Sequence, residues 1–138
     1  MVTLEINNQT GFKPPKEKLK REAQRTLKNV DLGGNYTISI ALVKKETLRK
    51  INKNWRGKDK KAGVLSFTDK EARGAFYQPE KEEFLGEIFL CPDYIREKAA
   101  QSDKKFEDEF IHFFNHGILH LAGLNHDQME KIKKPANR

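Results

Sequence analysis

Apolar and polar residues along this chain follow the two spacings that distinguish strands from helices. Residues 2–6 alternate with a period of two, and residues 37–43 are rich in Ile, Val and Thr taken together, as is typical of strands. Shorter apolar runs at residues 64–67 and 86–90 have the same character. The pattern therefore predicts four strands.

Helical spacing fills most of the remaining chain. Helices are predicted at residues 14–27, 46–55, 92–101 and 106–121, with a last helical turn or two after His126. Leu48, Ile51 and Trp55 fall on one side of the second helix, so Trp55 is expected to anchor it in the core. The polar stretch at residues 68–83 is expected to be a long surface loop.

This order of elements predicts an α/β (mixed α+β) fold with a mixed four-stranded sheet covered by helices. The 138 residues contain no repeat or linker, so we expect a single domain over residues 1–138. Cys91 is the only cysteine, and neither an export signal nor a long apolar run is evident. A cytoplasmic protein without a membrane-spanning segment is expected.

Positive charge is concentrated in the first half of the chain. The formal net charge is +7, and residues 44–61 contain nine Lys or Arg against two Asp or Glu. Residues 80–109 have the opposite balance, with ten acidic and five basic residues. A polyanionic partner is favoured, with nucleic acid ahead of a membrane surface, although lysine-rich helices can also be only solvated surface.

All four histidines lie near the C-terminus, and three of them form the pattern His116-x-x-x-His120-x-x-Gly123-x-x-His126. Two imidazoles four residues apart project from one side of a helix. Gly123 can end that helix and turn the chain back toward His126. Three imidazoles leave one tetrahedral position open, which is typical of a catalytic zinc site. We therefore predict one zinc ion per chain, held by His116, His120 and His126.

Two neighbouring residues refine this prediction. Gly117 stands where a zinc protease with this spacing needs its glutamate base, which argues against peptide hydrolysis and would leave room beside the metal. His112 is one turn earlier on the same helix and is expected to be a neighbour of the site. A purely structural zinc would favour a fourth protein ligand, for which His112 or Asp127 are the candidates.

With this histidine pattern, the sequence resembles the YbeY family of bacterial endoribonucleases. The match is strongest at residues 116–126, HGILHLAGLNH, where the family reads H-G-x-L-H-L-x-G-x-D-H. Further matches are WRGKD at residues 55–59, VLSF at residues 64–67 and LGEI at residues 85–88. Ala62-Gly63 and Asn125 depart from the family pattern, since each replaces a usual carboxylate near the expected site.

The resemblance implies an α/β domain with a zincin-like metal helix near the C-terminus, bearing a three-histidine zinc. It also implies cleavage of single-stranded RNA, maturation of small-subunit ribosomal RNA and ribosome quality control. The expected partners are therefore ribosomal RNA and the small ribosomal subunit. By this match, Arg56 corresponds to an arginine that is important in the family.

The residues themselves agree with a role for Arg56, which lies in the most basic segment. A guanidinium can bind a phosphate with two hydrogen bonds and stabilise the charge that develops on it. Zinc would then bind a phosphate oxygen or activate water, while Lys58, Lys60 and Lys61 guide the RNA backbone. Trp55 is the candidate for stacking on a base, if it is not in the core. No residue indicates the general base.

Two other functions remain open from the sequence. The first is a non-enzymatic, ribosome-associated RNA-binding factor in which zinc only stabilises the C-terminal helix. The second is a metal-dependent hydrolase that acts on another substrate.

Overall fold

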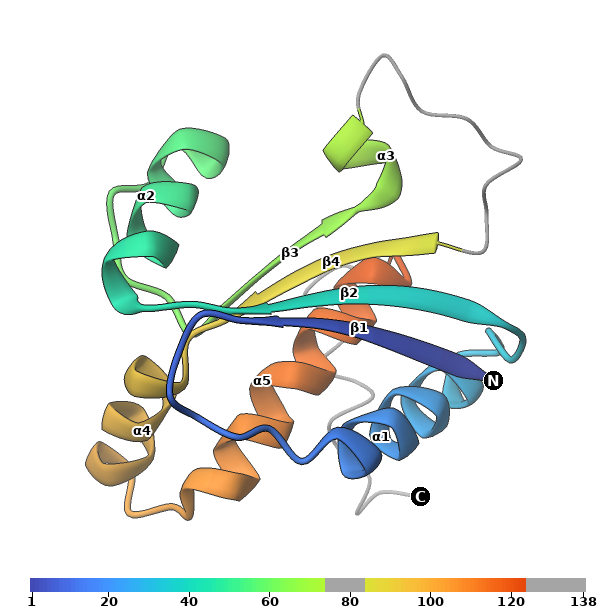
Figure 1. Cartoon of the computed structure of the whole chain (residues 1–138), viewed down its shortest axis with the longest axis horizontal. Helices are drawn as coiled ribbons and strands as arrows, with labels where there is room; N and C mark the ends of the chain where they lie inside the picture. Colours follow the sequence, from blue (N-terminus) through green and yellow to red (C-terminus); the bar gives the residue numbers. More distant parts are fainter. Residues whose placement is uncertain (74–83, 124–138) are drawn as a thin grey trace.

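The four predicted strands form one sheet in the computed structural model of the chain, which describes residues 1–73 and 84–123. They are β1 (Val2–Asn8), β2 (Tyr36–Leu42), β3 (Val64–Thr68) and β4 (Phe84–Leu90), in the spatial order β1-β2-β4-β3. β1, β2 and β4 are parallel, whereas β3 is antiparallel to β4 and forms one edge. The predicted mixed four-stranded sheet is confirmed (Figure 1).

Among the described residues, five helices cover the two faces of the sheet, and four of them lie where the sequence predicts helices. They are α1 (Lys16–Asn29), α2 (Lys45–Arg56), α3 (Asp69–Arg73), α4 (Pro92–Gln101) and α5 (Phe106–Leu121). Within the described residues, no helix has the length and apolar character needed to cross a membrane. The predicted turn after His126 lies outside these residues.

The short helix α3 contradicts the expectation of an irregular loop from residue 68 onward. Its start is capped reciprocally, because the Thr68 backbone N–H donates to Glu71 Oε1 at 2.9 Å and the Glu71 N–H donates to Thr68 Oγ1 at 3.1 Å. This is a capping box, in which two backbone N–H groups at the helix start are satisfied reciprocally. Five residues are too few for helical periodicity to predict, so the cap is the only local signal.

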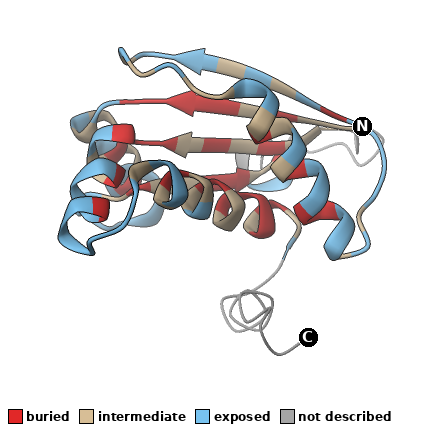
Figure 2. Ribbon diagram, turned by 90° about the horizontal axis from the view of Figure 1, so that it is seen from below, coloured by how far each residue is buried: buried red, intermediate tan, exposed pale blue. Residues whose placement is uncertain are grey.

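The main core lies between the sheet and the helices α1, α4 and α5. Buried side chains there include Leu19, Leu27, Ile38, Ile40, Ile88, Leu90, Ile95, Phe110, Phe114 and Ile118. Figure 2 shows the buried positions gathered where these helices meet the strands, with exposed positions on the outer sides of the helices. The phenylalanines of α5 therefore pack as its apolar pattern indicates.

The opposite face of the sheet carries α2 and α3, as Figure 1 shows, and its buried cluster is smaller. That cluster contains Ala41, Val43, Leu48 and Cys91. The predicted apolar side of α2 is only partly correct, because Leu48 and Asn52 are buried while Trp55 is 64% exposed. Asn52 donates to the Lys60 carbonyl at 3.1 Å, so a polar contact replaces the expected tryptophan anchor.

Gly86 is a position in β4 that only glycine fits. Its φ is 149°, and a Cβ built there would lie 2.2 Å from the Phe67 carbonyl oxygen and 2.8 Å from the Leu121 side chain. The pairing of β2 with β4 shifts register beside it, between Thr37 and Ile38. The glycine of the LGEI segment thus allows β3, β4 and α5 to approach closely where the candidate site begins.

Candidate active site

Helix α5 places His116 and His120 one turn apart at the wall of a cavity of about 430 Å³. The cavity is also lined by Asn52, Arg56, Lys58, Val64, Leu65 and Ser66. These residues come from α2, the following loop and the edge strand β3. Two of the predicted zinc ligands and the predicted catalytic arginine, distant in sequence, therefore face one cavity.

The third predicted ligand, His126, lies outside the described residues, as do Asn125 and Asp127. Within residues 1–73 and 84–123, no group of three His, Cys, Asp or Glu side chains is arranged to hold a metal ion. Gly123 has a φ of 86° directly after α5, as expected for a glycine that ends a helix. The three-histidine site accordingly stays a prediction, with its first two members positioned together.

His112 is exposed and does not line this cavity. Its ring centroid is 6.3 Å from that of His116. This position agrees with a neighbouring role and does not favour His112 as a fourth ligand.

Gly117 has a packing role that the sequence did not indicate. It is buried, and a Cβ built there would lie 3.1–3.3 Å from the side chains of Ile88 and Val64. The glycine therefore lets α5 pack tightly on β3 and β4, and its close neighbours are sheet residues. The expectation that Gly117 leaves room beside a metal stays a prediction, and one of its close neighbours, Val64, lines the cavity of His116 and His120.

Arg56 is held from three directions at the edge of the sheet. Its Nη2 donates to the Ser66 carbonyl oxygen at 2.7 Å, and its Nη1 lies 3.3 Å from Glu71 Oε2. Its guanidinium carbon also lies 4.6 Å from the centre of the Phe67 ring. These contacts fix the plane of a guanidinium that has five N–H donors, and they orient it beside the histidines.

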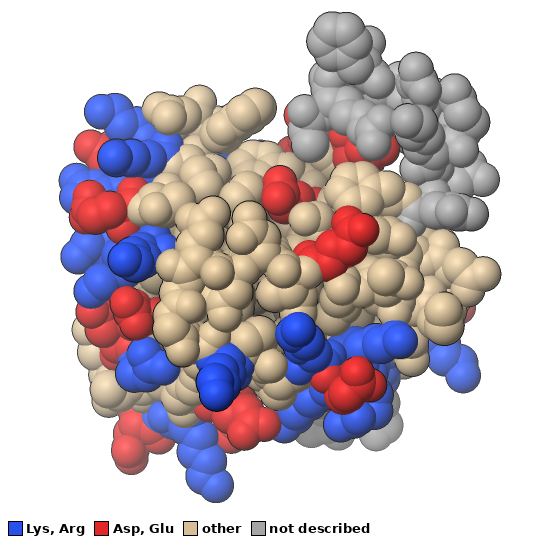
Figure 3. Space-filling model, viewed as in Figure 1, with Lys and Arg blue, Asp and Glu red and all other residues tan. Residues whose placement is uncertain are grey.

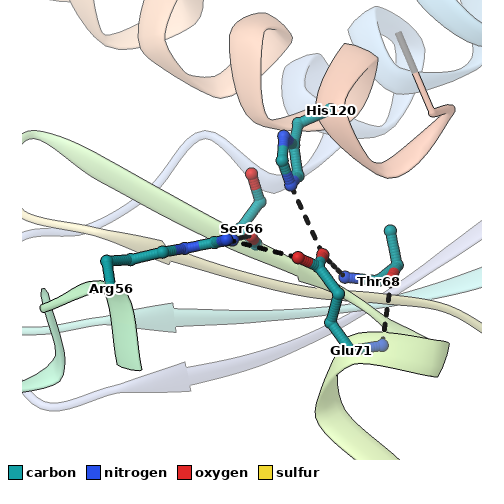
Figure 4. A network of polar contacts seen from close by, with 5 residues as sticks. All are labelled: Arg56, Ser66, Thr68, Glu71 and His120. Atoms are coloured by element: carbon teal, nitrogen blue, oxygen red, sulfur yellow. Dashed lines mark hydrogen bonds and ion pairs between the residues drawn. The ribbon is translucent and has the colours of Figure 1, made fainter. Parts of the chain in front are cut away.

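Glu71 connects the arginine to the histidine helix, as Figure 4 shows. Its Oε1 lies 3.4 Å from His120 Nε2, while its Oε2 contacts Arg56. Burial alone would raise the pKa of this carboxyl. The hydrogen bond from the Thr68 backbone and the nearby Arg56 and His120 outweigh burial, so its pKa is lowered. Glu71 is therefore a carboxylate at neutral pH, placed between the two predicted functional groups.

The surroundings of the cavity are basic but partly neutralised. Lys58 lines the cavity itself, whereas on α2 Lys45 pairs with Glu97 and Arg49 pairs with Asp59. In Figure 3, Lys and Arg lie along the left side, where α2 lies in Figure 1, and along the lower edge, with acidic groups among them. Part of the basic segment thus forms surface ion pairs, and part faces the site.

Comparison with known proteins agrees with this arrangement. The sequence model of the family described as Endoribonuclease YbeY matches residues 5–137. The chain belongs to the YbeY endoribonuclease family.

Individual YbeY relatives match most of the chain. The Endoribonuclease YbeY of Renibacterium salmoninarum is 30% identical over 131 residues, covering 94% of this chain and 83% of that protein. The Endoribonuclease YbeY of Persephonella marina is 34% identical over 129 residues, covering 91% of this chain and 80% of that protein. A Thermotoga maritima protein of known solution structure has 29% identity and a TM-score of 0.56, covering 91% of this chain and 75% of that one.

Membership of the YbeY family confirms the resemblance drawn from the histidine, arginine and LGEI segments. It supports an RNA-cleaving hydrolase and implies an RNA substrate. The family-level evidence agrees with the arginine and basic residues around the cavity.

One departure from the YbeY pattern has a structural counterpart. Gly63 stands where the family usually has a carboxylate, and a Cβ built there would lie 2.8 Å from the Phe113 ring. An aspartate at this position would require Phe113 to move. Gly63 therefore fits the close approach of the Phe113 ring from α5.

Two residues of the site were not identified from the sequence. Glu71 had a usable signal, because Thr68-x-x-Glu71 is a capping pattern, but nothing local indicates its contacts with Arg56 and His120. Ser66 contributes its backbone carbonyl, which no side-chain pattern can reveal.

Proposed function

We propose that this YbeY-family chain is a zinc-dependent endoribonuclease specific for single-stranded RNA, acting in small-subunit ribosomal RNA maturation and ribosome quality control. The observation that supports it most is the shared cavity of Arg56, His116 and His120. It combines a phosphate-binding group with two of the side chains that zinc prefers. The ribosomal substrate and the small subunit as partner rest on the family resemblance.

The described residues of this cavity fit a zinc ion. Two imidazoles line one cavity from consecutive turns of α5, and α5 is followed by the turn at Gly123. His116, His120 and His126 would hold the ion. When bound, zinc supplies Lewis-acid polarisation of a phosphate oxygen.

Arg56 would bind the phosphate at the cleavage position. Its guanidinium is already oriented by Ser66, Glu71 and Phe67, so little side-chain freedom is lost when a phosphate binds. Fixed donors directed at developing charge are the largest contribution in many active sites. We therefore assign Arg56 to the transition state as well as to substrate binding.

Glu71 would act as a positioning residue for both partners. As a carboxylate it attracts the Arg56 guanidinium on one side and the His120 imidazole on the other. A carboxylate beside a ligating histidine commonly sets the orientation of the ring. Replacing Glu71 by glutamine should therefore loosen Arg56 and His120 without removing either.

The decisive experiment compares RNA cleavage by the wild-type protein, Arg56→Ala and Arg56→Lys, at equal zinc content and with unchanged thermal unfolding. Arg56→Ala should lose about a hundredfold in rate, because the clamp on the phosphoryl charge is gone. Arg56→Lys should recover only part of it, since an ammonium does not form the bidentate pair. The matched control is Arg49→Ala, which removes an α2 arginine that pairs with Asp59 and does not line the cavity.

Wild-type cleavage rates in Arg56→Ala under saturating RNA would remove this arginine from catalysis. A comparable loss in Arg49→Ala would show that general positive charge, and not the position of Arg56, is what matters.

A further inference from the structure

A second, smaller pocket lies on the α2 side of the sheet. Its volume is about 200 Å³, and it is lined by Ile51, Trp55, Phe67, Glu87 and Phe89. We call it the Trp55 pocket. It combines three aromatic rings with one carboxyl group, and of these residues the proposed cleavage reaction uses only Phe67, which packs against Arg56.

The aromatic rings form a continuous wall. The Phe67 ring centroid is 5.9 Å from that of Trp55 and 6.0 Å from that of Phe89, both in edge-to-face geometry. Trp55, the single tryptophan of the chain, is 64% exposed even though it contacts Phe67. An exposed aromatic ring beside a small pocket is the usual platform on which a base of single-stranded RNA stacks.

Glu87 gives the pocket a specific polar group. Its carboxyl is half-buried among these rings, and its Oε2 lies 3.5 Å from Ser39 Oγ, at the limit of a hydrogen bond. Burial raises the pKa of Glu87 and the Ser39 contact only partly opposes this. A carboxyl group beside aromatic rings is unfavourable for stability, and carboxyl groups in such surroundings are concentrated at functional sites.

The Trp55 pocket and the candidate active site meet at the edge strand β3. Ser66 and Phe67 are consecutive residues of this strand whose side chains point to opposite faces of the sheet, and they line the cavity and the pocket respectively. Arg56 spans the two, because it donates to the Ser66 carbonyl and lies over the Phe67 ring. A nucleotide whose phosphate is bound by Arg56 therefore has its base within reach of the pocket.

The carboxyl group selects among the four bases. A carboxylate is an acceptor with two oxygens, and guanine alone presents two adjacent N–H donors on its Watson–Crick edge. Adenine and cytosine place a ring acceptor beside their amino group, and uracil flanks its single N–H with two carbonyls. An ionised Glu87 would be repelled by those acceptors.

We propose that the Trp55 pocket binds the guanine base of a nucleotide next to the cleaved bond, with Trp55 stacking on the base and Glu87 accepting from its Watson–Crick edge. The assignment rests on the proposed RNA cleavage at the neighbouring cavity. It makes Trp55 and Glu87 specificity-determining residues.

The first test uses Trp55 as its own probe. The protein is titrated with GMP, IMP, AMP, CMP and UMP while tryptophan fluorescence is recorded, since all of the signal comes from Trp55. GMP should change the fluorescence saturably and bind roughly tenfold or more tightly than IMP, which lacks the exocyclic amino donor. Equal responses to all five nucleotides, or none at millimolar concentration, would overturn the proposal.

Substitutions assign the selectivity to the carboxyl group. Glu87→Gln should abolish the difference between GMP and IMP while leaving thermal stability at neutral pH equal or higher, because the buried carboxyl is removed. Glu46→Gln, an exposed glutamate of α2 that does not line the pocket, is the matched control and should behave as wild type. Retained selectivity in Glu87→Gln would contradict the role of Glu87.

Cleavage then separates this proposal from the one on which it rests. Single-stranded RNAs with one guanosine, or one inosine at the same place, should be cut beside guanosine in preference. Cleavage without base preference, together with no selective GMP response, would refute the pocket and leave the endoribonuclease intact. Selective GMP binding without any RNA cleavage would refute the endoribonuclease and leave the guanine site standing.

Discussion

The two faces of the sheet differ in how completely they are covered. Beneath α1, α4 and α5 the buried side chains form one large apolar cluster, including Phe110 and Phe114. Beneath α2 the buried cluster is small, and α2 ends with an exposed Trp55 and with Arg56 directed to the sheet edge. The first face stabilises the fold, and the candidate site forms where elements of both faces meet at β3.

This difference separates residues whose loss should unfold the protein from residues whose loss should change what it binds. Helix α5 contains both kinds, because its phenylalanines Phe110 and Phe114 are buried in the core while His116 and His120 line the cavity. Substitutions on the two faces should therefore affect different measurements.

The largest effect on stability is expected from Phe114→Ala. Phe114 is fully buried in the main core, so its removal should lower the free energy of unfolding by about 3–5 kcal/mol. Trp55→Ala is the contrast, with a loss below about 1 kcal/mol because the ring is largely exposed. Urea unfolding at constant m-value measures both. Similar losses for the two variants would contradict the division between the faces.

The next largest loss is expected from Gly86→Ala, which should lower the free energy of unfolding by about 2–4 kcal/mol. The new Cβ would meet the Phe67 carbonyl at 2.2 Å, and the φ of 149° is unfavourable for alanine. Gly11→Ala is the control, since a Cβ there has no neighbour within 4 Å. Thermal unfolding distinguishes the two variants. A Gly86→Ala protein as stable as the wild type would contradict the close approach of β3 to β4 at this glycine.

Periodicity predicted the packed face better than the open one. The strand β4 and the apolar side of α5 follow from local spacing, because their buried positions recur at the period of each element. Spacing failed on α2, where Asn52 is buried through its bond to the Lys60 carbonyl and Trp55 is left outside. That contact depends on the path of a later loop, which no helical pattern encodes.

The sequence indicated which side chains belong to the candidate site, but not the contacts that hold them together. The histidine spacing and the family segments are sufficient to identify His116, His120 and Arg56 as members of the set. The contact of Glu71 with both Arg56 and His120 joins residues that are far apart in the sequence. Such pairs are brought together by the whole fold, so no local pattern of residues indicates them.

The smallest effect is expected from Lys58→Ala, and it concerns the affinity for RNA. Lys58 lines the cavity, so its loss should weaken RNA binding similarly for all sequences and reduce the salt slope of the affinity by about one. Lys45→Ala is the control, since Lys45 pairs with Glu97 and does not line the cavity. Binding measured over a range of salt concentrations distinguishes them. An unchanged slope for Lys58→Ala would place the RNA backbone elsewhere.

The central claim is that cleavage depends on zinc held by the histidines of the cavity. The most direct test measures the zinc content of the protein, removes the zinc and adds it back. The purified protein should contain about one zinc ion per chain, lose RNA cleavage when a chelator removes it, and regain cleavage at one equivalent of added zinc. His120→Ala should prevent both zinc retention and recovery, whereas His112→Ala should retain both, because His112 does not line the cavity. RNA cleavage that persists in metal-free protein, or full zinc content in His120→Ala, would contradict the account.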